Sequence, residues 1–129
     1  MPITVLLTHD EEAVRNLIRR LLDSDPEIHT VGEAVNVQQT IQRLIELKPQ
    51  ILLLDLRIAD KSSVNPQEIK SQLNTLGSRL IAMSFWTDED AQALAERLGA
   101  VTLLDKLTLT TDLIPAIKAA SIKRRSADG

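Results

Sequence analysis

The 129-residue chain contains no cysteine, which excludes disulfide bonds and thiolate metal sites. It has one Phe, one Trp and no Tyr, so its core must be built from aliphatic side chains. Only four glycines occur, and none belongs to a glycine-rich phosphate-binding loop, which argues against a nucleotide site. No apolar run approaches the roughly 20 residues that a membrane-spanning helix requires. The composition therefore indicates one aliphatic globular domain without a membrane segment.

Positive charge is also limited. The net charge of −3 argues against a domain built to bind nucleic acid through its phosphates. The amino terminus, Met1 to Thr4, carries no positive charge and leads directly into a strand pattern, so no secretory signal is expected. Together with the lack of cysteine, this favours a cytoplasmic location.

The stretch from Gln50 to Leu56 is the most informative part of the chain. Four consecutive apolar residues precede Asp55, and so short a run predicts a strand buried on both faces of a parallel sheet. A carboxylate at the end of such a strand would point into the crevice where open α/β sheets bind ligands. Taken alone, Asp55 is better interpreted as the cap of a turn. Its functional interpretation therefore depends on the residues that end the other strands.

Apolar segments of strand length alternate with helical patterns along the whole chain. Five strands and five helices predict an α/β fold, a three-layer α/β/α sandwich around a parallel sheet. Helix starts are indicated at Asn36, at Asn65 and, as a cap paired with Asp90, at Thr87. The predicted strands cover residues 3–8, 28–33 at a sheet edge, 50–56, 80–84 and 101–105.

Helical spacing also predicts which side chains face the sheet. Residues 59–64 are polar and predict a loop. The last helix is expected to open at residues 111–112, close enough to Pro115 for the proline to be tolerated, with Ile117 and Ile122 on its apolar face. The predicted inward positions are Val14, Leu17, Ile18, Leu21 and Leu22 in the first helix, and Val37, Ile41, Leu44 and Ile45 in the second.

Polar residues stand at the ends of four predicted strands. Asp10 follows the first, Asp55 ends the third, Ser84 ends the fourth and Lys106 follows the fifth. Parallel strands bring these ends to one rim of the sheet. Two neighbouring carboxylates favour a hard divalent cation such as Mg²⁺, and a hydroxyl and an ammonium can bind phosphoryl oxygens. A carboxylate in this setting can act as a nucleophile for phosphoryl transfer.

These residues, with the pattern from Gly99-Ala100 to Lys106, make residues 3–120 resemble the receiver domains of bacterial response regulators. The resemblance implies a flavodoxin-like sheet of order 2-1-3-4-5. It implies that Asp55 accepts a phosphoryl group from a histidine kinase, and that the protein is a self-dephosphorylating switch more than an enzyme. Asp10, Asp55 and the backbone carbonyl of Arg57 would ligate Mg²⁺, while Ser84 and Lys106 would contact the phosphoryl oxygens.

Several positions depart from that family pattern. His9 stands where a second acid usually follows the first strand, which predicts weaker Mg²⁺ binding. We interpret His9 as a half-exposed polar residue that changes the pocket charge, in preference to a metal ligand, because Mg²⁺ prefers oxygen. Phe85 replaces a small residue after Ser84, and Leu103 replaces an aromatic residue in the fifth strand. Both predict a small or differently routed conformational change on activation.

Other interpretations of these residues stay open at this stage. Asp10 suits a helix cap, Ser84 is an ordinary strand-ending serine, and Lys106 suits a solvated surface. Phe85 and Trp86 form either a lid or partner patch, or a pair packed over the fourth helix. The main rival is a pseudo-receiver, a protein-interaction module of the same fold that is not phosphorylated. A small flavin or nucleotide protein is disfavoured by the missing phosphate loop.

The expected domain organisation is a receiver at residues 1–122 and a polar tail or linker start at residues 123–129. Nothing in these residues supplies an output, so we expect either a single-domain regulator or, with a slight preference, the receiver end of a longer protein with a DNA-binding, helix-turn-helix effector. Expected partners are a sensor histidine kinase, that output domain and a second copy, bound through the fourth helix, fifth strand and last helix.

Overall fold

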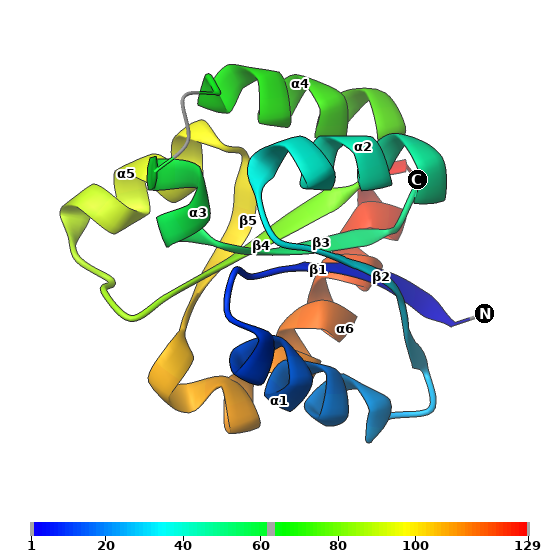
Figure 1. Cartoon of the computed structure of the whole chain (residues 1–129). Coiled ribbons are helices and arrows are strands. Elements are labelled where there is room, and N and C mark those ends of the chain that lie inside the picture. The colour runs from blue at the N-terminus through cyan, green and yellow to red at the C-terminus, as the bar shows by residue number, and fades with distance from the viewer. Residues whose placement is uncertain (1, 62–63, 129) are drawn as a thin grey trace.

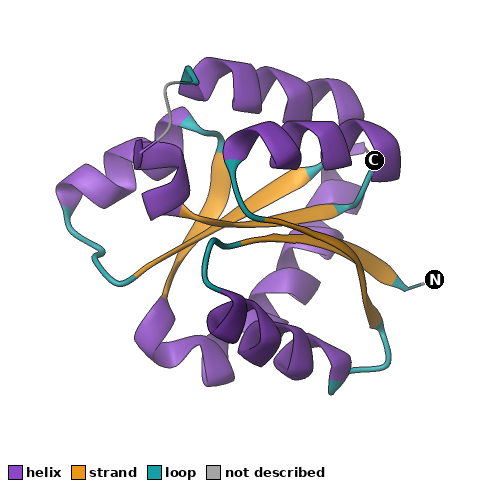
Figure 2. Ribbon diagram, in the orientation of Figure 1, coloured by secondary structure: helices purple, strands orange, loops and turns teal. Residues whose placement is uncertain are grey.

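The computed structural model describes residues 2–61 and 64–128, and side chains up to residue 121. It shows a five-stranded parallel sheet in the order β2-β1-β3-β4-β5, which confirms the predicted class and strand order (Figures 1 and 2). The strands are β1 (Ile3–Thr8), β2 (Ile28–Ala34), β3 (Ile51–Asp55), β4 (Arg79–Ser84) and β5 (Ala100–Asp105).

Strand β3 lies at the centre of the sheet, between β1 and β4, and all of its residues are buried. Its apolar side chains alternate between two cores: Leu52 and Leu54 point to one, Ile51 and Leu53 to the other. Each fully buried side chain of this size contributes about 1.5–3 kcal/mol. This burial fixes the register of β3 and so the position of Asp55 at its carboxyl end.

The helices form a layer on each face of the sheet (Figure 1). Helices α1 and α6 cover one face, and α2 to α5 cover the other, each layer with its own core. The bounds are α1 (Glu12–Asp23), α2 (Val37–Leu47), α3 (Leu56–Lys61), α4 (Pro66–Leu76), α5 (Glu89–Arg97) and α6 (Leu109–Asp128), with a short 3-10 helix, η1 (Lys106–Thr108), before α6. None of the described helices combines the length and apolarity needed to cross a bilayer.

The prediction of a loop at residues 59–64 is wrong for residues 59–61, which belong to α3. The described chain has six α-helices, not five, because α3 follows β3 directly. Leu56, Ile58 and Ala59 bury their side chains against the α2–α5 core, and this apolar anchoring holds a helical turn that the following polar residues obscure in the sequence. Ser62 and Ser63, the middle of the predicted loop, lie outside the described residues.

Two predicted inward positions are wrong as well. Leu17 in α1 is 63% exposed and Ile45 in α2 is 52% exposed. Each is the neighbour of a buried residue, Ile18 or Leu44, and successive helical residues are rotated by about 100°. The apolar stripe in the sequence is therefore wider than the face that reaches the sheet.

Helix boundaries differ from the prediction at two further points. Asp88, not Thr87, caps α5, and its side chain accepts a hydrogen bond from the Ala91 N–H at 3.1 Å. Helix α6 begins at Leu109 rather than at 111–112, so Pro115 lies inside it. The backbone of α6 continues to Asp128, while the Ile122 side chain and Gly129 lie outside the described part. The predicted division at residue 122 stays a prediction. The caps at Asn36 and Asn65 are confirmed.

Candidate functional site

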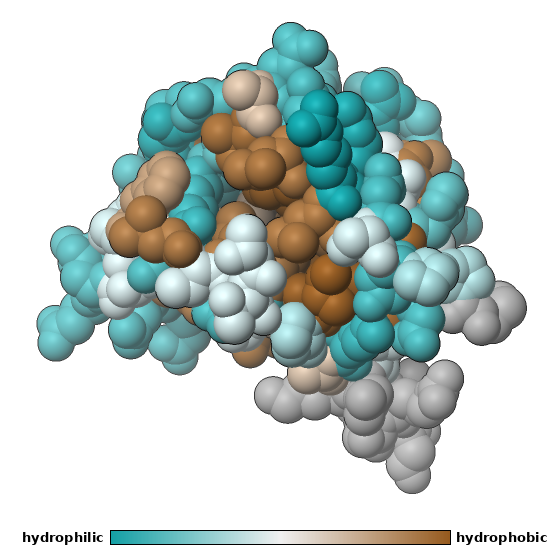
Figure 3. Space-filling model, turned by 90° about the horizontal axis from the view of Figure 1, so that it is seen from below, coloured by the Kyte–Doolittle hydropathy of each residue, from teal (hydrophilic) through white to brown (hydrophobic). Residues whose placement is uncertain are grey.

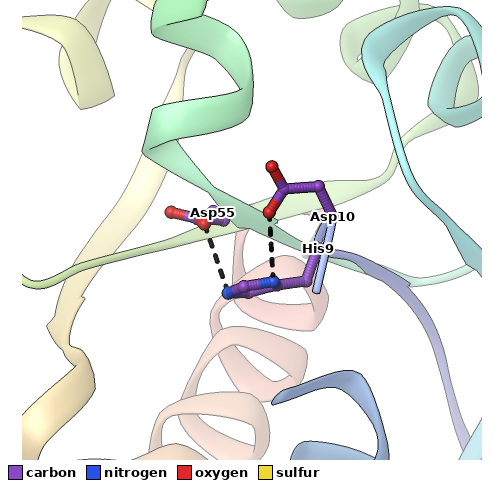
Figure 4. A group of neighbouring side chains, drawn as sticks. All are labelled: His9, Asp10 and Asp55. Atoms are coloured by element: carbon purple, nitrogen blue, oxygen red, sulfur yellow. Dashed lines mark ion pairs between the residues drawn. The ribbon is translucent and has the colours of Figure 1, made fainter. Parts of the chain in front are cut away.

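The polar residues at the strand ends meet at one rim of the sheet, as predicted. His9 and Asp10 follow β1 directly, Asp55 is the last residue of the neighbouring strand β3, and Lys106 opens η1 after β5. Figure 4 shows the His9 ring between the two carboxylates. Ser84, the last residue of β4, is fully buried, and its hydroxyl accepts a hydrogen bond from the Trp86 N–H at 3.0 Å.

Asp55 is 1% exposed, and its two carboxylate oxygens differ in their contacts. Oδ1 accepts a hydrogen bond from the Arg57 N–H at 3.2 Å, so Asp55 does shape the turn after β3. Oδ2 lies 2.9 Å from Lys106 Nζ and 3.2 Å from His9 Nε2, but the contact with Lys106 is an ion pair without hydrogen-bond geometry. Among the described residues, Oδ2 therefore has a charge partner and no hydrogen bond. A buried carboxylate oxygen in this state is a candidate nucleophile or metal ligand.

The prediction that His9 is half-exposed is wrong, because its side chain is fully buried. Its backbone N–H donates to the Ala34 carbonyl at 3.1 Å, which extends the β1–β2 pairing by one residue. Its carbonyl accepts a hydrogen bond from the Arg15 side chain at 2.9 Å. These bonds hold the residue at the floor of the pocket, where the ring lies 3.6 Å from Asp10 Oδ1 and contacts Asp55.

Burial lowers the pKa of His9 below its ordinary value, and the Lys106 ammonium lowers it further, against the opposing effect of the acids. The ring geometry has the same consequence. The Glu11 N–H donates to Nδ1 at 3.1 Å, and Lys106 Nζ lies 2.8 Å from Nε2. A protonated ring would carry a hydrogen on Nδ1 and could not accept the hydrogen bond from the Glu11 N–H. His9 is thus neutral, where a second acid would carry a negative charge.

Asp10 is paired on both of its carboxylate oxygens. Oδ1 accepts a hydrogen bond from Arg57 at 2.8 Å, and Oδ2 accepts one from Lys61 at 2.9 Å. These bonds, with that from Lys61 the largest cause, lower the pKa of Asp10 and keep it ionised. Asp10 does not cap α1, because Glu11 holds the N-cap position and makes no side-chain cap bond. Sequence reasoning missed Lys61 because it placed this residue in a loop.

The aromatic pair divides between two surfaces. Phe85 is 64% exposed, and Lys106 Nζ lies 4.8 Å from the centre of its ring, so Phe85 leans over the lysine and not over α5. Trp86 is half-buried and packs against the α2–α5 core. Leu103 is also half-buried against that core. The small conformational change expected from Phe85 and Leu103 stays a prediction.

Comparison with known proteins decides the family. A family model described as the response regulator receiver domain matches residues 5–118. The chain belongs to this family of receiver domains. The transcriptional regulatory protein LiaR of Bacillus subtilis is 28% identical over 92% of this chain and 56% of its own length. The nitrate/nitrite response regulator protein NarL of Escherichia coli is 30% identical, over 93% of this chain and 55% of its own length.

A solved receiver structure has the same fold. The response regulator domain of Thermotoga maritima CheB aligns with a TM-score of 0.79 and 27% identity, covering 93% of this chain and 96% of that domain. The receiver described here spans about half the length of the curated relatives that it matches. It is the receiver domain of a two-component response regulator.

Proposed function

We propose that this receiver accepts a phosphoryl group on Asp55 from a histidine kinase and acts as a signalling switch. The observation that carries the proposal is the state of Asp55 Oδ2, which is buried, lies 2.9 Å from the Lys106 ammonium and makes no hydrogen bond with any described residue. Among the described residues this oxygen has an ion-pair partner but no hydrogen-bond donor. Such a carboxylate is prepared to form a bond to an electrophile.

In the proposed reaction, Asp55 Oδ2 attacks the phosphorus of a phosphohistidine. A P–O bond forms, the P–N bond breaks, and its electron pair stays on the kinase imidazole. Lys106, beside Oδ2, would contact the phosphoryl oxygens, and the Ser84 hydroxyl, whose oxygen accepts from the Trp86 N–H, would donate its hydrogen to one of them. The product is an acyl phosphate, which water can hydrolyse without a separate enzyme.

The donor set fits Mg²⁺, which receiver domains generally bind in an acidic pocket. Asp10, Asp55 and the Arg57 backbone carbonyl offer oxygen ligands, and the orphaned Asp55 Oδ2 is one of them. When bound, Mg²⁺ would neutralise negative charge on the phosphoryl group and its acceptor. His9 adds no charge to this set and has both ring nitrogens in contact with donors, so we propose weak binding.

The kinase is proposed to dock on an apolar groove beside the pocket. The groove lies between α1 and the start of α6, on the face shown in Figure 3, where apolar side chains gather. Leu17, Phe85 and Leu107 stand exposed around it, and Lys106 lines it as well as contacting Asp55. A kinase helix that buries its apolar side here would bring its phosphohistidine to the acceptor.

Substituting Leu17 by Gln should lower the rate of phosphotransfer from the cognate kinase by about tenfold, the loss of one well-packed interface side chain. Labelling by a small phosphodonor should be unchanged, because Leu17 lies outside the pocket. The matched control is Ile45→Gln, which removes an apolar side chain of similar exposure from the opposite layer. Rapid-quench transfer assays measure both. Equal transfer rates for wild type and Leu17→Gln would rule out this docking surface.

The proposed output is control of transcription, in the cytoplasm. It rests on relatives such as the transcriptional regulatory protein LiaR, and the effector would be a DNA-binding domain. Dimerisation through α5, β5 and α6 is part of the same proposal. Two small side chains of α6, the half-buried Ala116 and the exposed Ala119, border Val101 and Thr102 of β5 and leave room for a second copy.

A pseudo-receiver is the second candidate, and one observation favours it. Both carboxylate oxygens of Asp10 already pair with a basic side chain, Arg57 or Lys61, so the negative charge of Asp10 is compensated without a metal. Incubation with a small phosphodonor and Mg²⁺, followed by intact-mass spectrometry, separates the two candidates. The phosphoacceptor proposal expects one added phosphoryl group. No addition under conditions that label an ordinary receiver would favour the pseudo-receiver.

A further inference from the structure

Each acidic side chain of the pocket lies beside a basic side chain, and the described acids and bases are equal in number. The Arg57 guanidinium reaches three carboxylates: it lies 2.8 Å from Asp10 Oδ1, 3.1 Å from Glu11 Oε1 and 3.9 Å from Asp55 Oδ2. Lys61 pairs with Asp10, and Lys106 with Asp55. The acids are Asp10, Glu11 and Asp55, and the cations are Arg57, Lys61 and Lys106.

The contact between Lys61 and Asp10 has the features of a competitor for metal. Lys61 is the last residue of α3, 51 positions from Asp10 in sequence, and its ammonium lies 2.9 Å from Asp10 Oδ2. A divalent cation coordinates the same lone pairs that this ammonium occupies. Arg57 engages the other oxygen of Asp10. Both oxygens would therefore have to exchange a protein donor for metal or water.

We propose that Lys61, assisted by Arg57, is a built-in counter-ion that competes with Mg²⁺ for Asp10. Entry of the metal displaces the Lys61 ammonium and releases the carboxyl end of α3 from the β1–α1 connection. This inference rests on the proposed metal site. It deepens the proposed function, because Mg²⁺ binding would be coupled to the position of α3 through Lys61.

The solvent exposure of Lys61 and Arg57 determines how strongly they compete with Mg²⁺ for Asp10. The side chains of Lys61 and Arg57 are 58% and 45% exposed, so solvent screens both pairs. Exposed pairs of this kind have modest strength, which corresponds to about two- to fivefold in an equilibrium constant for each side chain. Lys61 therefore weakens Mg²⁺ binding without preventing it.

The test is calorimetric titration of the whole chain with MgCl₂ at low ionic strength. Lys61→Gln should bind Mg²⁺ about two- to fivefold more tightly than wild type. Lys61→Arg keeps the charge and should bind like wild type. The remote control is Lys118→Gln, which removes the same charge from α6, where Lys118 pairs with Asp25, and should leave the affinity unchanged. Amide NMR shifts should report movement of α3 when wild type is titrated.

Three results would overturn the inference. They are an unchanged affinity in Lys61→Gln, an equal gain in Lys118→Gln, and absence of Mg²⁺ binding from every variant. Phosphodonor labelling separates this inference from the proposed function. Labelling of Asp55 together with any of these results leaves the acceptor role standing and removes the competition. Tighter binding in Lys61→Gln without labelling supports the competition and removes the acceptor role.

Discussion

Asp55→Asn should abolish phosphorylation of the protein by a small phosphodonor and by the kinase. The amide replaces Oδ2, the buried oxygen beside Lys106, or leaves a neutral carbonyl in its place, and neither is a nucleophile toward phosphorus. The variant should still fold, because the residue is nearly isosteric and, with its amide oxygen at the Oδ1 position, keeps the contact with the Arg57 N–H. Intact-mass spectrometry should show no added phosphoryl group, a loss of at least about a hundredfold in labelling.

The matched control for Asp55→Asn is Asp105→Asn. Asp105 also ends a strand at this rim, but its side chain accepts a hydrogen bond from the Leu107 N–H at 2.9 Å. Its labelling should equal that of wild type. Full labelling of Asp55→Asn would show that another residue accepts the phosphoryl group.

His9→Asp should tighten Mg²⁺ binding by at least about tenfold, because it adds a full negative charge close to the metal ligands. The His9 ring lies 3.2 Å from Asp55 Oδ2 and 3.6 Å from Asp10 Oδ1, so a carboxylate in its place falls beside both. Without metal, the three carboxylates repel one another, and the variant should be less stable than wild type. Mg²⁺ at about 100 times its Kd should return about 2.7 kcal/mol of stability.

Two variants control the His9 substitution. His9→Asn keeps the site neutral and should not gain affinity for Mg²⁺. His29→Asp adds the same charge at an exposed position of the edge strand β2 and should change neither affinity nor stability by much. Calorimetry and thermal unfolding with and without MgCl₂ measure all three. An unchanged Mg²⁺ affinity in His9→Asp would contradict the proposed role of the pocket charge.

The sequence was sufficient to predict the sheet and the place of Asp55 at its rim. The short apolar run from Ile51 to Leu54 favours a doubly buried strand. Parallel strands bring their carboxyl ends to one rim, which collects Asp10, Asp55, Ser84 and Lys106 there. Strong caps at Asn36 and Asn65 fixed two helix starts, because their side chains satisfy backbone N–H groups locally. Local chemistry and simple geometry therefore account for these predictions.

The missed features depend on contacts between segments distant in sequence. The burial of His9 depends on its backbone pairing with Ala34 on the neighbouring strand β2, a contact that has no local signal in the sequence. Lys61 reaches Asp10 only because Leu56, Ile58 and Ala59 hold α3 on the core. The exposed position of Leu17 reflects which part of a wide apolar stripe the sheet can reach.

The most direct test of the central claim is to locate the phosphoryl group itself. Wild-type protein is labelled with a small phosphodonor and Mg²⁺ and then reduced with borohydride, which converts an aspartyl phosphate to homoserine, and peptide mass spectrometry identifies the changed residue. The account predicts homoserine at position 55 in wild type and at no position in Asp55→Asn. Homoserine at another aspartate, or none in wild type under conditions that convert an ordinary receiver, would contradict it.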